Sequence, residues 1–244
     1  MKYVVTSTVT IEVEDRTPAV AGACWYRAKT GAWTPQGIDT LRMFLSLAHA
    51  RRARHVVDVG ASGGTWTLAF AELPLVESVT AYEPADPVFE LLTANAALSA
   101  KHEKITLTHA AVGAEQRRVR FLLASNAAYS HAGEKMLRQH GPQKLGVTPI
   151  DVDMVKLDDQ LLLWERGVDA IKIDVEGSEF DVLRGGIGLI EAKRPLILFE
   201  DQPTNLKQHG IAVGSSMKLL AVLGYSFKKV GTCDVLATPL PRKG

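Results

Sequence analysis

The sequence predicts an α/β fold: a seven-stranded, mostly parallel sheet with one antiparallel strand and helices on both faces. Short apolar runs of about five residues alternate with longer segments of helical period, which is typical of strand–helix units around a parallel sheet. The first run in this series ends in an aspartate and a glycine-rich turn, "HVVDVGASGG" at residues 55–64. The last two runs, residues 225–230 and 233–239, are joined by a short turn, so these two strands must be antiparallel.

The chain is long enough for one large domain. Its 244 residues are 46% apolar, which suffices for a single sizeable core. We expect this domain over residues 31–244, after an N-terminal extension over residues 1–30 whose alternating pattern predicts a strand or a hairpin. Such a strand can pair within the chain or across the two-fold axis of a homodimer, and the sequence leaves the oligomeric state open.

The overall charge is nearly balanced, with 28 Lys and Arg against 27 Asp and Glu and a net charge of +1. This balance gives no field that would attract nucleic acid or an anionic membrane, and we expect neither as a partner. The two cysteines lack the spacing of a zinc site or a disulfide framework, and no metal is predicted. Because no signal peptide or membrane-spanning run is recognisable, we expect a cytoplasmic protein.

The first half of the domain contains three strands and the helices between them. Thr34 as the cap and Pro35 at the first helical position predict a helix that begins at residue 35 and has one apolar face, formed by residues between 38 and 48. Asp86 and Pro87 provide the same signals for the helix after the second strand. The predicted strands are residues 55–60, 76–84 and 104–113.

The second half begins with residues 114–157, which interrupt this rhythm. An insertion of this length is either disordered or functional. Ser178, with Asp181 three residues later, has the pattern of a capping box and predicts a helix that ends at Gly185–Gly186. The remaining predicted elements are strands at 169–177 and 195–201, a helix at 215–224, and the final two strands, which turn at Gly231–Thr232.

Polar residues follow the first two strands where a ligand is expected. In open α/β sheets, ligands bind beyond the carboxyl ends of the strands, where the strand order reverses. Asp58, Gly60, Ser62 and Gly64 follow the first strand, and these glycines let the backbone approach a ligand closely. Glu83 follows the second strand, where a carboxylate can accept both hydroxyls of a ribose. The pattern predicts a nucleoside site; the spacing of a dinucleotide-binding loop is absent, and no P-loop is present.

Six segments occur in order between Trp33 and Glu200: "VVDVGASGGTWT", "VTAYEPADPVFELLTANAAL", "HAAVG", "VKLDDQL", "DAIKIDVEGSEFDVLRGG" and "RPLILFE". Together they resemble the FkbM family of S-adenosylmethionine-dependent methyltransferases, and "KIDVEG" with the downstream "VLRG" is the most specific piece. The resemblance implies a Rossmann-like class I methyltransferase fold with S-adenosyl-L-methionine as cofactor. Ser62 departs from the family, which more often has Asn there, and residues 1–30 lie outside the resemblance.

The resemblance also implies roles for individual residues around the cofactor. Glu83 binds the ribose, and Trp66 either covers the cofactor or packs under the first helix, of which we favour packing. The residues expected to line the methionine and sugar portions are Asp58, Gly60, Ala61, Ser62 and Gly64, with Pro84 beside Glu83 and with Ala110 and Ala111 at the adenine.

Acidic residues at the ends of the fourth and fifth strands are the candidates for catalysis. Methyl transfer requires an aligned acceptor and a group that takes its proton. Asp174, Glu176 and Glu200 occupy this region, and Asp174 is also expected to contact the cofactor. Lys172 is expected to pair with Asp174 and keep it ionised. Asp201 is expected to be a solvated residue at the strand end.

His131, in the insertion, is a second candidate for the proton acceptor because a neutral imidazole accepts a hydroxyl proton near neutral pH. His140 lies in the same segment and is a weaker candidate. The carboxylates could also hold a divalent cation, but without His or Asn at fixed spacing we do not predict one.

The function expected from these features is methyl transfer from S-adenosylmethionine to a hydroxyl of a small molecule, a sugar or a natural product. Oxygen is favoured over nitrogen because "IDVEGS" replaces the Asn/Asp-Pro-Pro-aromatic motif that nucleic-acid amino-methyltransferases typically display after the fourth strand. Two alternatives stay open: a non-catalytic nucleoside-binding module and a nicotinamide-dependent oxidoreductase.

Overall fold

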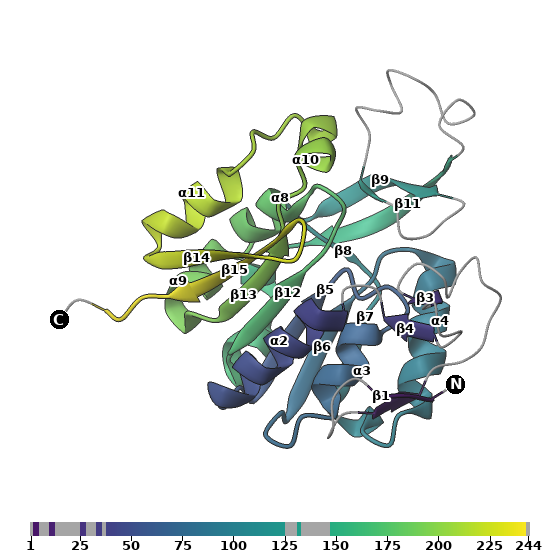
Figure 1. Ribbon diagram of the computed structural model, residues 1–244. Coiled ribbons are helices and arrows are strands. Elements are labelled where there is room, and N and C mark those ends of the chain that lie inside the picture. The colour runs from purple at the N-terminus through teal and green to yellow at the C-terminus, as the bar shows by residue number, and fades with distance from the viewer. Residues whose placement is uncertain are drawn as a thin grey trace.

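The computed structural model describes residues 2–4, 10–12, 25–27, 33–35, 38–124, 131–132 and 147–242. Its centre is a seven-stranded sheet of order β14-β15-β13-β12-β5-β6-β7 (Figure 1). Strand β15 is antiparallel to both of its neighbours, and the other neighbouring pairs are parallel. The predicted sheet is therefore confirmed. Its strands are β5 (His55–Val59), β6 (Ser78–Tyr82), β7 (Ile105–Thr108), β12 (Ala170–Ile173), β13 (Leu196–Glu200), β14 (Tyr225–Val230) and β15 (Asp234–Pro239).

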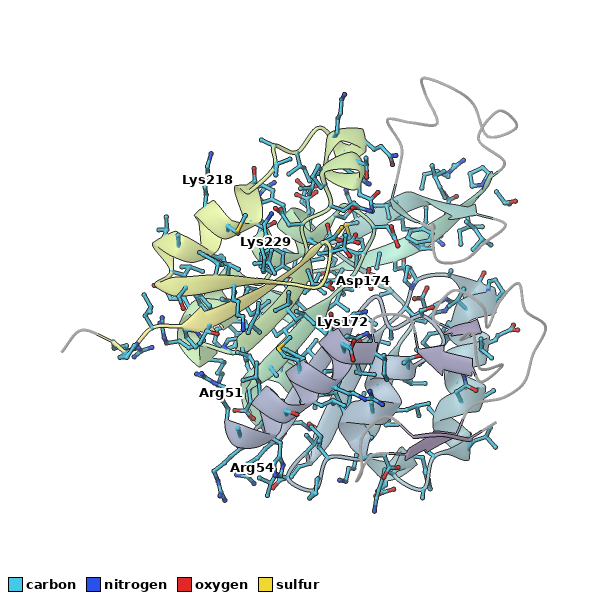
Figure 2. The ribbon with its side chains drawn as sticks, viewed as in Figure 1. Arg51, Arg54, Lys172, Asp174, Lys218 and Lys229 are labelled. Carbon is cyan, nitrogen blue, oxygen red and sulfur yellow. The ribbon has the colours of Figure 1, made fainter. Side chains whose placement is uncertain are left out.

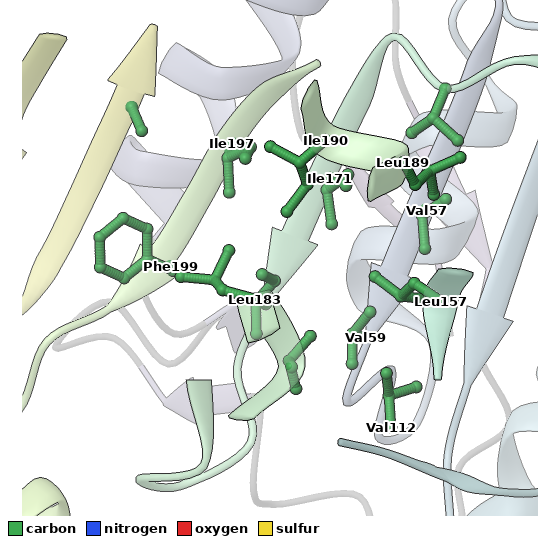
Figure 3. Packing of buried hydrophobic residues seen from close by; sticks show 14 of the residues in the cluster. Val57, Val59, Val112, Leu157, Ile171, Leu183, Leu189, Ile190, Ile197 and Phe199 are labelled. Carbon is green, nitrogen blue, oxygen red and sulfur yellow. The ribbon is translucent and has the colours of Figure 1, made fainter. Parts of the chain in front are cut away.

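Helices cover both faces of this sheet. They are α2 (Ile38–Ala50), α3 (Thr65–Ala71), α4 (Asp86–Leu98), α7 (Leu161–Arg166), α8 (Glu179–Arg184), α9 (Ile187–Lys193), α10 (Pro203–His209) and α11 (Ser215–Val222), with short 3-10 turns at His102–Lys104 and Leu157–Asp159. Alternate strand residues point to opposite faces. Val56 and Ala170 therefore pack with α2 and α3, whereas Val57 and Ile171 pack with α8 and α9 (Figure 3).

Helix α2 starts later than predicted. Thr34 and Pro35 lie in β4 (Trp33–Pro35), which pairs antiparallel with β3 (Trp25–Arg27), and α2 begins at Ile38. The expected cap at Thr34 is wrong, because a proline is also compatible with an edge strand. The predicted apolar face is confirmed, since Leu41, Phe44, Leu45 and Ala48 are buried.

The N-terminal residues described contain two short strands. β1 (Lys2–Val4) pairs antiparallel with β2 (Thr10–Glu12). The alternating pattern of this segment thus corresponds to strand pairing within one chain.

The predicted third strand is divided between two sheets. After β7 the chain turns, with Ala110 N donating to Thr108 O, and β8 (Ala111–Val112) pairs parallel with β11 (Val147–Val155). β11 pairs antiparallel with β9 (Arg117–Ala124), which pairs with β10 (His131–Ala132). Figure 1 shows β9 and β11 standing outside the main sheet. The insertion at 114–157 therefore contributes most of a second sheet, of order β10-β9-β11-β8.

Two helix starts differ in detail from the prediction. Ala85 is the cap residue of α4, and Asp86 lies in its first turn beside Pro87. Ser178 occupies the cap position of α8 but makes no capping hydrogen bond with its side chain. The predicted end of α8 at Gly185 is confirmed. Among the described helices, which lie within residues 38–124 and 147–242, none combines the length and the hydrophobicity of a membrane-spanning segment.

Candidate active site

The candidate site lies at the carboxyl ends of β5, β6, β12 and β13. The chain runs from β5 outward to β6 and β7, then returns to place β12 and β13 on the other side of β5. The strand order therefore reverses between β5 and β12, and this is the position at which α/β sheets bind ligands. Most of the predicted site residues follow these four strands.

The loop after β5 is shaped by three left-handed residues: Gly60, Ser62 and Gly64 have φ values of 78°, 49° and 94°. A Cβ atom on Gly60 would lie 1.9 Å from the carbonyl oxygen of Asp174, and one on Gly64 would lie 2.9 Å from Leu92 Cδ1. These glycines therefore let the loop pack against β12 and α4, a role beyond the ligand approach predicted for them. Ala61 is buried against α4 in the same loop.

Glu83 ties this loop to the start of α4. Its carboxylate accepts hydrogen bonds from the backbone N–H of Ser62 and of Ala85, each at 3.0 Å. The side chain is buried, and burial raises the pKa of Glu83 to about 7 even though both hydrogen bonds lower it. The sequence located this carboxylate but not its two backbone partners.

The segment after β7 lies beside Glu83. Pro84 O accepts a hydrogen bond from His109 Nε2 at 3.1 Å, and the His109 ring stacks on Phe89 with the centroids 4.4 Å apart. Ala110 and Ala111 are buried where the chain leaves β7 for β8. His109 was not predicted, because a single histidine after a strand carries no distinctive pattern.

Asp58 is fully buried rather than exposed to a ligand. It accepts a hydrogen bond from Thr67 Oγ1 at 2.6 Å, and Lys172 Nζ lies 3.7 Å away. Burial raises the pKa of Asp58, and the Lys172 charge opposes this rise. The predicted pairing of Lys172 with Asp174 is present at 3.4 Å, and the Asp174 side chain is 46% exposed. Figure 2 labels Lys172 and Asp174 close together near the centre of the molecule.

Glu176 and Glu200 are brought together by a residue that the sequence did not reveal. Asn205 of α10 donates from Nδ2 to Glu176 Oε2 at 2.9 Å and to Glu200 Oε2 at 3.2 Å. Burial, reinforced by the charges of Asp174 and Glu200, raises the pKa of Glu176 to about 8. Burial and the Asp174 charge raise the pKa of Glu200 to about 7.

Asp234 extends this acidic group. It lies opposite Glu200 in the pairing of β13 with β15, and burial raises its pKa to about 6. Its place follows from the antiparallel pairing of the last strand, a register that the sequence could not specify. The sequence around Asn205 predicts neither a helix nor a strand, so it gives no signal for this residue.

The turn after β12 is organised by Glu179 instead of by a Ser178 cap. Glu179 Oε1 accepts hydrogen bonds from Val175 N and Gly177 N, both at 3.1 Å. Glu176 adopts a φ of 55°, a strained value for a residue with a side chain. The turn at Glu176 and Gly177 thus directs the Glu176 side chain toward Asn205.

Trp66 and Asp201, which the sequence also singled out, have definite positions. Trp66 packs against Phe44 and Phe70, with ring centroids 6.0 and 5.8 Å away, which confirms the packing interpretation. Asp201 is buried, and its Oδ1 atom has no hydrogen-bond partner, so the expected solvation is wrong. It is covered because its backbone continues the pairing with the last hairpin, donating to Cys233 O.

The backbone of His131 lies in β10 opposite Leu122, and its side chain is outside the described part. His140 lies wholly outside the described residues. In the portion of the chain with assigned positions, no group of three or more His, Cys, Asp or Glu side chains is placed to hold a metal ion.

The seven-stranded sheet with helices on both faces is the fold of the Rossmann-like methyltransferases. The FkbM methyltransferase domain matches residues 58–227 of this sequence. The chain belongs to the FkbM methyltransferase family.

Solved structures with this fold include those of two methyltransferases. The FkbM methyltransferase from Methylobacillus flagellatus KT is 18% identical, with a TM-score of 0.52, and the alignment covers 76% of this chain. This chain spans only 44% of the length of that protein. An O-methyltransferase from Bacillus cereus, solved in complex with SAH, is 13% identical with a TM-score of 0.50, and the alignment covers 83% of this chain and 81% of that one. No curated protein sequence matches this chain.

Proposed function

We propose that this protein transfers a methyl group from S-adenosylmethionine to a hydroxyl oxygen of a small molecule, a sugar or a natural product. One observation carries the proposal: Glu83 and the carboxylates of Asp174, Glu176 and Glu200 follow strands on the two sides of the switch point. Membership of the FkbM methyltransferase family supports methyl transfer. The similar fold of an O-methyltransferase solved with SAH is consistent with this cofactor.

The residues present fit S-adenosylmethionine, which supplies an activated methyl group on a cationic sulfur. Each oxygen of Glu83 accepts one backbone hydrogen bond and retains a further lone pair for a ribose hydroxyl. The two backbone donors fix the carboxylate before any ligand arrives. The partly exposed carboxylate of Asp174 suits a positively charged donor.

Glu176 and Glu200 are assigned as the proton acceptors for the hydroxyl group. A general base works best when its pKa lies near the working pH, and the pKa values of about 8 and about 7 meet this condition. Asn205 holds both carboxyl groups in one place, so the acceptor meets a fixed pair. Asp174 is assigned as the group that orients the acceptor, and His131 remains the second candidate for the base.

The proposal is tested by calorimetric titration with S-adenosylmethionine, followed by measurement of S-adenosylhomocysteine released with a panel of sugars and small hydroxyl compounds. We expect binding, release with at least one hydroxyl compound, and loss of release in Glu176→Gln or Glu200→Gln. If S-adenosylhomocysteine release is lost in His131→Ala but in neither glutamate variant, the proton acceptor is His131 of the insertion. Binding without release from any compound would favour a nucleoside-binding module, and competition by NADH would favour an oxidoreductase.

A further inference from the structure

Lys172 is a cation in the middle of the sheet. It lies on the central strand β12, paired with Asp58 of β5 on one side and Leu198 of β13 on the other. Only 4% of the residue is exposed. Burying a charge is costly unless it is paired and hydrogen-bonded, so this ammonium group must depend on its neighbours.

These neighbours come from two parts of the candidate site, the loop after β5 and the turn after β12. Lys172 Nζ donates to Gly60 O at 3.2 Å, which belongs to the loop after β5. The same Nζ atom lies 3.4 Å from Oδ2 of Asp174, which directly follows β12, and 3.7 Å from Oδ1 of Asp58. The ring of Trp66, in the first turn of α3, is centred 5.8 Å away.

These two parts also meet through their backbones. A Cβ atom on Gly60 would lie 1.9 Å from Asp174 O, so no side chain separates the two turns. Asp174 N donates to Val59 O, which continues the pairing of β12 with β5 to the edge of the site. The ammonium of Lys172 therefore bridges two turns that are already in contact.

We infer that Lys172 is a positioning residue that orders the loop at 60–64 and the carboxylate of Asp174 together, so that cofactor binding depends on this buried charge. The inference rests on the proposed function, since it assumes that the loop at 60–64 holds the cofactor. Removing the ammonium frees Gly60 O and Asp174 at once.

The test uses a double variant. Lys172→Met alone leaves Asp58 as an unpaired buried charge, which is expected to destabilise the fold strongly. Asp58→Asn with Lys172→Met removes both charges and keeps similar side-chain volumes. The matched control is Lys104→Met, because Lys104 also donates to two backbone carbonyls, of Ala71 and Leu73, away from the site.

Urea denaturation establishes that each variant is folded, and calorimetric titration with S-adenosylhomocysteine measures its affinity. We expect the folded double variant to bind about tenfold more weakly or worse, and Lys104→Met to bind within about twofold of the unaltered protein. Unchanged affinity in the double variant would overturn this inference but not the proposed function. No binding to the unaltered protein would overturn the proposed function instead.

If the double variant does not fold, NMR of 15N-labelled lysine ammonium groups in the unaltered protein decides. The solvent-protected signal of Lys172 should shift when S-adenosylhomocysteine is added. A protected signal that stays unshifted at saturating ligand contradicts the inference.

Discussion

At the scale of single residues, Glu83 is a buried carboxyl group and Glu176 a half-buried one, and their surroundings differ. Glu83 accepts from two backbone donors that fix the loop after β5. Glu176 faces the carboxylates of Asp174, Glu200 and Glu179 and has one side-chain donor, Asn205. The backbone donors orient Glu83 as a hydrogen-bond acceptor and oppose the rise of its pKa, whereas the neighbouring carboxylates add to the effect of burial and raise the pKa of Glu176 to about 8.

Replacing Glu83 by alanine should weaken both cofactor binding and the fold. We expect a loss of about 1–3 kcal/mol in cofactor affinity, and a similar loss in the free energy of unfolding because Ser62 N and Ala85 N lose their acceptor. Calorimetry and urea denaturation measure the two effects. Glu77→Ala is the control: it removes an exposed ion pair with Arg54 and should cost less than about 1 kcal/mol. Unchanged cofactor affinity in Glu83→Ala would remove the ribose assignment.

Glu176 should make the protein less stable at alkaline pH. The unfolded chain releases this proton near pH 4.5, whereas the folded chain keeps it up to about pH 8. The folded state therefore binds more protons in this window, and its stability falls as the pH rises. Glu176→Gln, which cannot ionise, should lose less stability than the unaltered protein between about pH 5.5 and about pH 8.5 in urea denaturation. An identical pH dependence in both proteins would show that Glu176 is not ionising in this range, with the exposed Glu77→Gln as the control for charge alone.

At the scale of elements, the site is held by contacts between turns. The loop after β5 touches the end of β12 through Gly60 and Asp174, and α10 touches the next turn, where a Cβ atom on Gly177 would lie 2.8 Å from Asn205 O. Such backbone contacts cannot relax as a flexible side chain can. The positions of Asp174, Glu176 and Asn205 therefore depend on glycines more than on side-chain packing.

Gly60→Ala should destabilise the protein more than Gly167→Ala. Both glycines have positive φ values, 78° and 89°, so both variants carry backbone strain. A Cβ atom on Gly60 would also clash with the carbonyl oxygen of Asp174, whereas nothing lies within 4 Å of a Cβ atom built on Gly167. We expect the free energy of unfolding to fall by about 2 kcal/mol more in Gly60→Ala. Equal losses in urea denaturation would mean that the contact with Asp174 is not rigid.

At the scale of the whole molecule, the sequence predicted the main sheet because its strands are short, apolar and separated by helical periods. The reversed strand β15 followed from a turn too short for a parallel crossover, between Val230 and Asp234. The general rule that ligands bind beyond the carboxyl ends of parallel strands made Asp58, Glu83 and Asp174 recognisable as candidates. The strand order, and with it the switch point between β5 and β12, comes from the structure.

Contacts between segments that are distant in the chain could not be predicted from the sequence. Residues 104–113 read as one strand, since nothing local marks the turn at Ala110 that sends β8 into a second sheet. Asp58 looked like a ligand-contacting residue, because its pairing with Lys172 depends on the register of β5 with β12. Asn205 lies on a short helix without clear periodicity. In each case the missing information is which segments meet, and single-chain patterns report only local structure.

The central claim is that the carboxyl-end edge of β5, β6 and β12 holds S-adenosylmethionine, with its ribose on Glu83. A crystal structure of the protein with S-adenosylhomocysteine tests this most directly. We predict the ribose hydroxyls within hydrogen-bond distance of the Glu83 carboxylate and the sulfur between the loop at 60–64 and Asp174. Density for the adenosyl group in any other crevice, with Glu83 free of it, would contradict the claim.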